Sequence, residues 1–246
     1  MEQNHKMKSL SRISKPSSPP GRRGLTIAID GPAGSGKSTA AKLVAKKLGY
    51  LYLDTGAMYR ALTWKALRNK INIKDKKGLC QLAKETKITL KSQSDLETKI
   101  YLDDKEVTSF IRSPLIDKNV SPISVVKGVR EAMVAEQKRM GKKGGIVAEG
   151  RDIGTVVFPK AEVKIFLTAS FKERVKRRWK EETNKGLSSE KKRVAIDLLT
   201  RDRIDSQRKI APLKKAREAV IIDNTCLNIP QTVDRILEVV KTKLTP

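Results

Sequence analysis

Short apolar runs alternate with longer amphipathic segments along most of this chain. The short runs are typical of buried strands and lie at residues 25–30, 50–54, 146–149, 163–167 and 219–223. The longer segments carry apolar residues at helical spacing and lie at 38–48, 58–69 and from 229 onward. Strands that alternate with helices predict an α/β fold, a central parallel sheet flanked by helices.

Residues 71–112 depart from this alternation. Two short alternating stretches, 87–90 and 99–102, are followed by Asp103-Asp104 and a third stretch at 105–108, which is typical of a hairpin. The pattern predicts a small antiparallel insert at about 71–112. The next region, 113–140, has a helical pattern, as does the strongly charged segment 171–209.

The N-terminal residues 1–24 are rich in Ser, Pro and Arg and show no apolar periodicity. This composition predicts a disordered basic tail. The folded domain is therefore expected to span residues 25–246.

The first strand leads into the pattern Gly-x-x-x-x-Gly-Lys-Ser, the P-loop of nucleoside-triphosphate-binding proteins. Glycines let the backbone approach a ligand and direct several N–H groups toward one anion, and the helix that follows adds its positive end. The lysine reaches the β- and γ-phosphates, and the serine hydroxyl is a ligand for Mg²⁺. The residues expected to bind ATP are Gly31, Pro32, Ala33, Gly34, Ser35, Gly36, Lys37, Ser38 and Thr39.

The composition narrows the class of protein. A chain of 246 residues with 38% hydrophobic content is long enough for one α/β domain. No apolar run reaches membrane-spanning length, and no apolar signal-peptide core follows Met1. His5 is the only histidine, which argues against histidine-based catalysis, and the isolated Cys80 and Cys226 are typical of reduced thiols in a cytoplasmic protein.

The formal net charge is +26. Such a charge attracts nucleic acid, anionic membranes or phosphorylated metabolites. Aromatic residues make up only 4% of the chain and do not alternate with the basic ones, so we expect no specific nucleic-acid partner. Because no apolar run is long enough to span a membrane, we also expect no membrane partner.

Arginine placement points to phosphoryl transfer. This reaction depends on positioning, a metal ion and cations around the migrating group, and the planar guanidinium binds phosphate oxygens bidentately. The candidates lie near strand ends, in loops or on helices: Arg60, Arg130, Arg151, Arg201 and Arg208. Arg201 and Arg208 are seven residues apart and are expected on one side of a helix. The guanine-reading motif Asn-Lys-x-Asp of switch GTPases is absent.

Several motifs together resemble bacterial cytidylate kinase. They are GPAGSGKST at 31–39, LDTGAMYR at 53–60, VREA at 129–132, EGRDIGTVVFP at 149–159, KIFLTA at 164–169, RDR at 201–203 and APL at 211–213. The resemblance runs from about residue 25 to the C-terminus and leaves out the tail. It implies a P-loop kinase fold in which the 71–112 insert binds the nucleoside monophosphate and 171–209 forms a helical lid.

The resemblance also implies the reaction. ATP with Mg²⁺ would phosphorylate CMP or dCMP to CDP or dCDP, in a monomeric enzyme. By position, Thr55 and Arg60 would hold the acceptor nucleotide, while Ser121, Arg130 and Asp152 would read the cytosine edge. Phosphate contacts would come from Arg151, Arg201 and Arg208, and a ribose contact from Asp205. The catalytic residues are expected to be Lys37, Arg151, Arg201 and Arg208.

Some roles stay open at this point. Asp152 is also compatible with an ion pair to Arg151 or with a loop cap, and Ser121, which precedes Pro122, is also compatible with a turn or helix N-cap. Glu149 follows the apolar run at 146–148 and is the positional candidate to hold Mg²⁺ through water. A helix-dipole or salt-bridge role for Glu149 is the alternative. Two other functions remain: a P-loop kinase with UMP, AMP or a non-nucleotide acceptor, and a nucleic-acid-binding ATPase.

Overall fold

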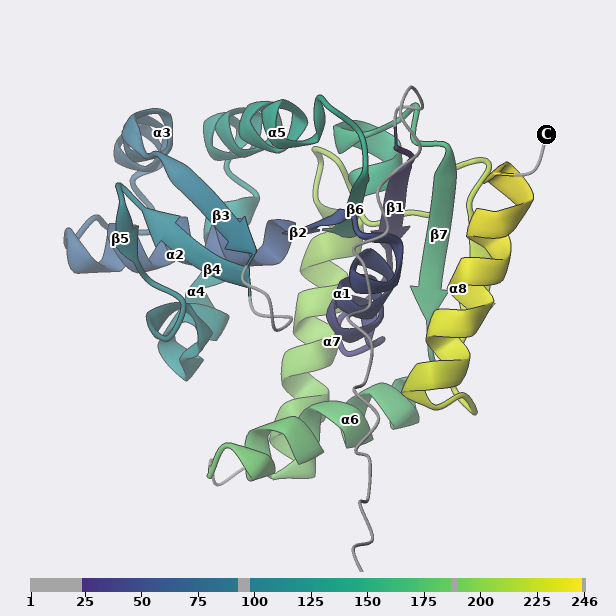
Figure 1. The fold of residues 1–246 in the computed structure, drawn as a ribbon. Coiled ribbons are helices and arrows are strands. Elements are labelled where there is room, and N and C mark those ends of the chain that lie inside the picture. Colours follow the sequence, from purple (N-terminus) through teal and green to yellow (C-terminus); the bar gives the residue numbers. More distant parts are fainter. Residues whose placement is uncertain (1–23, 93–97, 187–189, 245–246) are drawn as a thin grey trace, which may run out of the picture.

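A five-stranded parallel sheet forms the centre of the molecule (Figure 1). The computed structural model describes residues 24–92, 98–186 and 190–244, so most of the predicted tail lies outside the described residues. The strand order is β2-β6-β1-β7-β8. The strands are β1 (Thr26–Asp30), β2 (Leu51–Asp54), β6 (Ile146–Gly150), β7 (Val163–Thr168) and β8 (Val220–Asp223). The predicted α/β fold is confirmed.

Alternation along the strands assigns the apolar side chains to two layers. Ile27 and Ile29 pack into one cluster, while Ala28 between them packs into the other. Helices α1 (Lys37–Leu48) and α8 (Ile229–Leu244) cover the first face. Helices α2 (Thr55–Arg68), α3 (Lys76–Glu85) and α5 (Lys127–Gly141) cover the second.

The predicted antiparallel sheet is present in the insert. It consists of β3 (Ile88–Ser92), β4 (Thr98–Leu102) and β5 (Lys105–Glu106), in that order. Asp103 and Asp104 form the β4–β5 turn with φ of 48° and 64°, as a tight hairpin turn requires. The insert also contains α3, which was not predicted.

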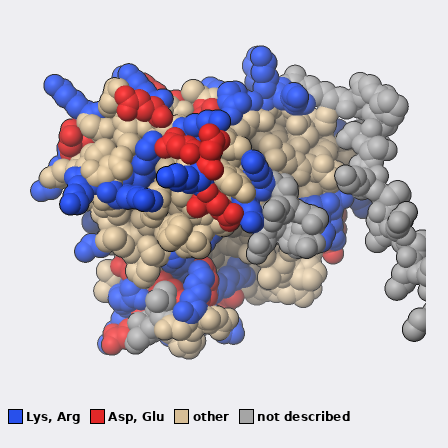
Figure 2. Space-filling view, turned by 60° about the vertical axis from the view of Figure 1, so that its left-hand side comes forward, with Lys and Arg blue, Asp and Glu red and all other residues tan. Residues whose placement is uncertain are grey.

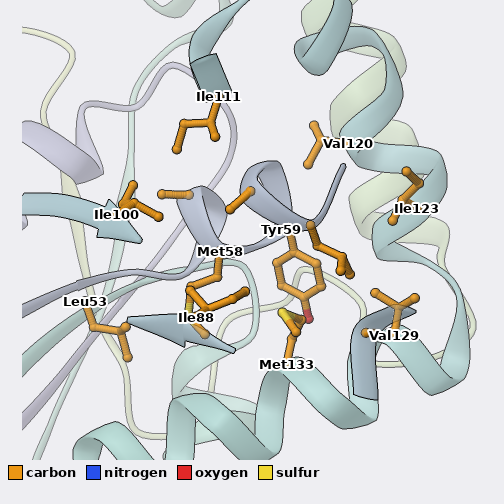
Figure 3. Packing of buried hydrophobic residues seen from close by; sticks show 14 of the residues in the cluster. Leu53, Met58, Tyr59, Ile88, Ile100, Ile111, Val120, Ile123, Val129 and Met133 are labelled. Atoms are coloured by element: carbon orange, nitrogen blue, oxygen red, sulfur yellow. The ribbon is translucent and has the colours of Figure 1, made fainter. Parts of the chain in front are cut away.

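The insert shares its core with the main sheet. Ile88 and Ile100 from the small sheet lie in one buried cluster with Met58 and Tyr59 of α2 and Met133 of α5 (Figure 3). The 71–112 region therefore has no separate core, and its folding is coupled to that of the α2–α5 layer.

Two boundaries differ from the sequence prediction, and two short turns are added to it. The expected helical region 113–140 is two helices, α4 (Pro114–Ser124) and α5, because Val126 between them is extended with ψ of 121°. Helix α2 begins at Thr55 rather than 58, because the Asp54 carboxylate caps it by accepting from the Ala57 N–H at 2.8 Å. A short 3₁₀ turn (Phe110–Arg112) precedes α4, and a single π-helical turn (Ile153–Val157) follows β6.

The last strand was expected in the core, but β8 lies at the edge of the sheet. It pairs only with β7 on the described part of the chain, and Val220 and Ile221 are exposed. Of its residues only Ile222 reaches the apolar cluster beneath α8.

The charged segment 171–209 contains α6 (Phe171–Asn184) and α7 (Lys191–Gln207). Helix α6 lies beyond the carboxyl end of β7 (Figure 1). Val194 and Leu198 of α7 pack with Ala33 of the P-loop, against Phe171 and Trp179 of α6. Within residues 24–92, 98–186 and 190–244, no helix has the length and apolar character of a membrane span.

The strand order marks one place for a ligand. From β1 the chain crosses over β6 to reach β2, whereas from β6 it crosses over β1 to reach β7. The two connections therefore run in opposite directions along the strand order. Ligands of open parallel sheets bind at such a switch point, beyond the carboxyl ends of the strands. The P-loop follows β1, and the loop with Arg151 and Asp152 follows β6, so both face this crevice.

The shared core predicts one unfolding transition. Replacing the fully buried Ile88 with Ala should lower the free energy of unfolding by about 2–4 kcal/mol, because it leaves a cavity in that core. Ile196→Ala on α7, whose side chain is exposed, is the matched control and should change stability by less than about 0.5 kcal/mol. Urea unfolding followed by fluorescence and circular dichroism measures both. Separate transitions for the two probes in the Ile88 variant would contradict a shared core.

Candidate active site

The N-terminus of α1 is left open for an anion. Gly36 is the N-cap residue and provides no side-chain cap, and the first turn of the helix carries no acidic residue. The unpaired N–H groups and the positive end of the helix dipole therefore face the crevice. Gly34 and Gly36 have φ of 73° and 85°, which only glycine adopts without strain.

The start of the P-loop lies against strand β7. A Cβ on Gly31 would lie 2.0 Å from the Leu167 carbonyl oxygen, so no larger residue fits there. The Asn224 side chain at the end of β8 donates to the Ser35 carbonyl at 3.0 Å. Two neighbouring parts of the sheet thus fix the shape of the loop.

Lys37 is buried in the loop that it serves. Its Nζ donates to the Pro32 carbonyl at 2.7 Å. Burial, and then the positive charge of Arg151, lower the pKa of Lys37 to about 7. The negative charge of a bound triphosphate would favour the protonated, charged form of the Lys37 amine.

Ser38 and Glu149 meet at the floor of the crevice. The Ser38 hydroxyl donates to Glu149 Oε1 at 2.6 Å, and the Thr55 hydroxyl donates to the Glu149 carbonyl at 2.7 Å. Burial, and then the negative charge of Asp54, raise the pKa of Glu149. A cation beside the Glu149 carboxylate would stabilise its charged form against burial and against the charge of Asp54. One hydroxyl and one carboxylate are suitable ligands for a Mg²⁺ ion that is bound mainly by phosphate oxygens. Within the described residues there is no cluster of three or more His, Cys, Asp or Glu able to hold a metal by itself.

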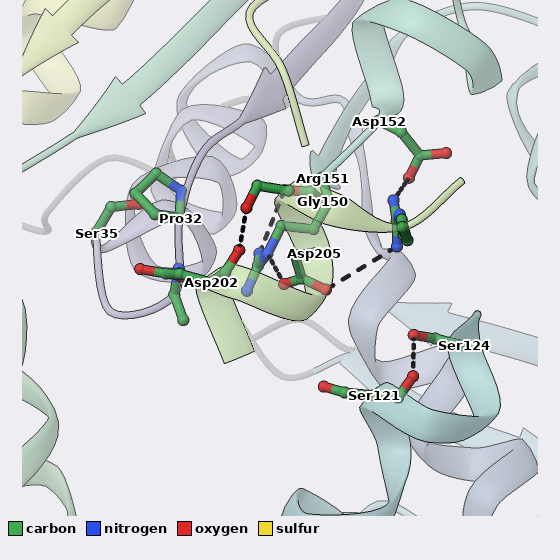
Figure 4. A network of polar contacts seen from close by, with 12 residues as sticks. Pro32, Ser35, Ser121, Ser124, Gly150, Arg151, Asp152, Asp202 and Asp205 are labelled. Atoms are coloured by element: carbon green, nitrogen blue, oxygen red, sulfur yellow. Dashed lines mark hydrogen bonds and ion pairs between the residues drawn. The ribbon is translucent and has the colours of Figure 1, made fainter. Parts of the chain in front are cut away.

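The arginines of the crevice are backed by carboxylates (Figure 4). Arg151 Nε donates to Asp205 Oδ2 at 2.8 Å. Asp152 pairs with two arginines, Arg130 through Oδ2 and Arg208 through Oδ1, the latter at 3.1 Å. All three arginines thus keep a fixed direction before any ligand binds.

Arg201 is the exception to this pairing. In the described ranges it makes no ion pair or hydrogen bond, and its Nε is buried without a partner. Burial, and then the nearby charges of Arg151 and Arg60, lower the pKa of Arg201 to about 10, which still leaves it charged at neutral pH. An unpaired guanidinium with a buried Nε, beside two other cations, is a strong site for an anion.

One continuous pocket of about 750 Å³ joins these parts. It is lined by every residue that the sequence assigned to the acceptor: Thr55, Arg60, Ser121, Arg130, Arg151, Asp152, Arg201, Asp205 and Arg208. Of the P-loop, Ala33, Gly34, Gly36, Lys37, Ser38 and Thr39 line it. Gly31, Pro32 and Ser35 do not line it and shape the loop from behind.

Three local expectations change. Arg208 is not on the same helix face as Arg201, because α7 ends at Gln207 and Arg208 is its C-cap residue. The N-cap of α4 is Ser113, so the N-cap alternative for Ser121 is wrong. The partners of Asp152 are Arg130 and Arg208, whereas Arg151 pairs with Asp205.

Several pocket residues were missed in the sequence. Arg112 pairs with Asp54 at 3.0 Å, and Arg177 and Arg178 reach the pocket from α6. The spacing of Arg174, Arg177 and Arg178, at i, i+3 and i+4, indicated one basic helix face and was the available signal. Other missed lining residues are Tyr59, Ser124, Asn224, Asn228 and Thr232.

Helices α6 and α7 contact the P-loop directly. The Asp202 carboxylate accepts from the Ala33 N–H at 3.1 Å and from Arg174 Nη1 at 2.5 Å. Arg174 Nη1 also donates to the Ala33 carbonyl at 3.0 Å. Arg177 donates to both the side chain and the carbonyl of Asn224, at 2.9 and 2.7 Å. Helices α6 and α7 thus lie directly against the P-loop.

A P-loop that faces an arginine-lined pocket across the switch point of a parallel sheet defines a P-loop phosphotransferase. Comparison of the sequence with known protein families and proteins identifies the family. The cytidylate kinase family model matches residues 27–242. A cytidylate kinase of Geobacillus sp. (strain WCH70) is 49% identical over 223 residues, which cover 91% of this chain and 99% of that protein. A cytidylate kinase of Bacillus subtilis (strain 168) is 47% identical over 219 residues, covering 89% and 97%.

The chain therefore belongs to the cytidylate kinase family. It is a nucleoside monophosphate kinase, a transferase, and its family uses ATP as the phosphoryl donor.

The lowered pKa of Lys37 predicts proton uptake when ATP binds. In the free protein the amine is mostly neutral at pH 8, because its pKa is about 7, and the triphosphate charge raises that pKa. Calorimetry at pH 8 in buffers of different ionisation enthalpy should show close to one more proton taken up by the wild type than by Lys37→Arg, which stays charged. The difference should vanish at pH 6. Equal uptake by both proteins at pH 8 would contradict a neutral Lys37.

Proposed function

We propose that this protein transfers the γ-phosphoryl group of ATP to CMP and dCMP, with Mg²⁺, and yields CDP or dCDP and ADP. The observation that carries the proposal is the buried Asp152 held between Arg130 and Arg208, across the same pocket from the P-loop. The 49% identity to a cytidylate kinase over nearly the whole chain supports it.

The pocket has the polarity that a cytosine edge needs. Cytosine presents an N4 donor beside the N3 and O2 acceptors. The Asp152 carboxylate has lone pairs beyond the two that its arginines use, so it can accept from N4. Arg130 and the Ser121 hydroxyl, both on the pocket wall, supply donors for N3 and O2. Uracil has a carbonyl in place of the N4 amine and would oppose an acceptor to an acceptor.

The phosphate groups would lie between the P-loop and the remaining arginines. Lys37 and the N-terminus of α1 take the ATP phosphates, and Arg60 and Thr55 hold the acceptor. An oxygen of the acceptor phosphate attacks the γ-phosphorus in line and is already anionic, so no general base is needed. Lys37, Arg151, Arg201 and Arg208 surround the migrating group with positive charge.

The Mg²⁺ ion would be held by Ser38 directly and by Glu149 through water. Their 2.6 Å contact at the floor of the pocket fits this role, because both are oxygen ligands of the kind that Mg²⁺ prefers. Bound Mg²⁺ would neutralise charge on the phosphate oxygens.

The remaining parts of the chain have roles in the same proposal. Of the described residues of the 71–112 insert, Arg112 lines the pocket, and through it the insert would contribute to binding the nucleoside monophosphate. The 171–209 segment would act as a lid that excludes water and limits ATP hydrolysis. We propose a monomer that acts in the cytoplasm and has no specific nucleic-acid partner. On the face in Figure 2, the described Lys and Arg residues lie among acidic and uncharged ones and form no continuous stripe.

The identity of the phosphoryl acceptor is tested most simply with a panel of nucleoside monophosphates. ADP release from ATP should be measured with CMP, dCMP, UMP, AMP and GMP, each at equal concentration. We expect CMP and dCMP to be the best acceptors, with UMP at least about tenfold lower in kcat/KM, since one mismatched base contact costs about 1–3 kcal/mol. Polynucleotide-stimulated hydrolysis without CDP formation would instead support a nucleic-acid-dependent ATPase.

Asp152→Asn tests the cytosine assignment. We expect the KM for CMP to rise about 10- to 100-fold, because the amide of Asn brings donors toward the N4 donor and leaves Arg130 without its counter-ion. The KM for ATP should change less than about threefold. Asp104→Asn removes a carboxylate from the exposed pair with Lys87 and is the control. An equal rise in both KM values would show that Asp152 does not read the base.

A further inference from the structure

Asp117 on α4 joins two arginines from different walls of the pocket. Its Oδ1 pairs with Arg60 Nη1 of α2, and its Oδ2 accepts from Arg178 Nη2 of α6 at 2.8 Å. We call this arrangement of Arg60, Asp117 and Arg178 the clasp. It links helices that are far apart in the sequence, and Asp117 is not one of the pocket residues assigned above.

The clasp is largely shielded from water. The side chains of Arg60, Asp117 and Arg178 are 11%, 24% and 23% exposed. Burial alone would raise the pKa of Asp117, but the charges of Arg60 and Arg178 outweigh it and lower the pKa below its usual range. Asp117 is therefore ionised at neutral pH, and each of its oxygens serves one arginine.

Arg60 keeps most of its donors for a ligand. A guanidinium has five N–H donors, and in the part of the chain that the structure describes Arg60 makes a hydrogen bond only to Asp117. Arg60 lines the pocket together with Thr55 and Arg201, and its other N–H groups make no hydrogen bond to the described residues. Asp117 thus holds Arg60 through one nitrogen of the guanidinium and leaves its other donors unused.

The other end of the clasp is anchored separately. Arg178 also donates to Glu181 and Glu182, each at 3.0 Å, within α6. Loss of the Asp117 carboxylate would leave Arg178 with these partners, whereas Arg60 would lose its only described one. The effect should therefore fall mainly on Arg60.

We propose that Asp117 is a positioning residue, which orients Arg60 toward the phosphate of the acceptor nucleotide and ties α6 to the α2–α4 wall of the pocket. This inference rests on the proposed function for the identity of the acceptor. Pre-orientation of Arg60 lowers the entropy cost of binding the acceptor, so it improves acceptor affinity more than it changes the chemical step.

Asp117→Asn tests the proposal with CMP as acceptor. We expect the KM for CMP to rise about fivefold to tenfold, because the partly buried, charge-assisted pair between Asp117 and Arg60 is lost. The kcat and the KM for ATP should each stay within about twofold of the wild-type values. Asp117→Glu retains the carboxylate and should recover most of the loss. Asp234→Asn, which breaks the exposed pair with Lys47, is the control and should match the wild type.

A double-mutant cycle tests whether the three residues act together. Arg178→Gln should raise the KM for CMP less than Asp117→Asn does, and the double variant should be no worse than Asp117→Asn alone. Additive effects, an unchanged KM for CMP in Asp117→Asn, or equal changes in both KM values would each overturn the proposal.

Hydrogen exchange separates this inference from the proposed function. In the free protein, the amides of α6 should exchange faster in Asp117→Asn than in Asp234→Asn, because one tie to α4 is lost. If the wild type does not phosphorylate CMP, the proposed function fails while this result still supports the clasp. If the wild type phosphorylates CMP and α6 exchanges equally in both variants, the clasp fails alone.

Discussion

The pocket depends on carboxylates that hold several buried arginines in place. Two like charges about 5 Å apart repel by roughly 3 kcal/mol at the effective dielectric constant of a protein surface. Asp205 offsets this repulsion for Arg151, Asp152 for Arg130 and Arg208. Arg201 alone has no such partner among the described residues, and its pKa is lowered. Most guanidinium groups of the pocket wall are thus held in one orientation by a carboxylate, and the charge of Arg201 is left without a counter-ion among the described residues.

The parallel sheet makes this arrangement possible. The Asp30 carboxylate at the end of β1 accepts from the N–H groups of Ile153 and Gly154, both at 2.8 Å. These two residues follow Arg151 and Asp152 directly, so the strand that leads into the P-loop also holds the loop that follows β6. Burial raises the pKa of Asp30 to about 6, which shows the cost of placing a carboxylate there. The P-loop and the loop with Arg151 and Asp152 are therefore fixed to one another through neighbouring strands.

Local sequence patterns predicted most of the fold and of the pocket lining. The ion pairs between residues far apart in the sequence could not be predicted in this way. The P-loop, the strands and the residues that line the pocket are readable because each depends on a short motif or period. Helix α3 was missed although Leu79 and Leu82 have helical spacing, because the hairpin pattern nearby dominated the interpretation of that region. The pairs Arg151–Asp205 and Arg60–Asp117 join residues more than fifty positions apart, and only the tertiary fold brings them together. β8 was expected in the core because its apolar run does not tell an edge strand from a central one.

The most direct test of this account is a crystal structure of the protein with CMP bound. It should show the cytosine N4 within hydrogen-bond distance of Asp152, the phosphate on Arg201 and Arg60, and Arg151 still paired with Asp205. A cytosine that lies away from Asp152, or a phosphate bound while Arg201 points out of the pocket, would contradict the claim that the carboxylates set out the acceptor site in advance.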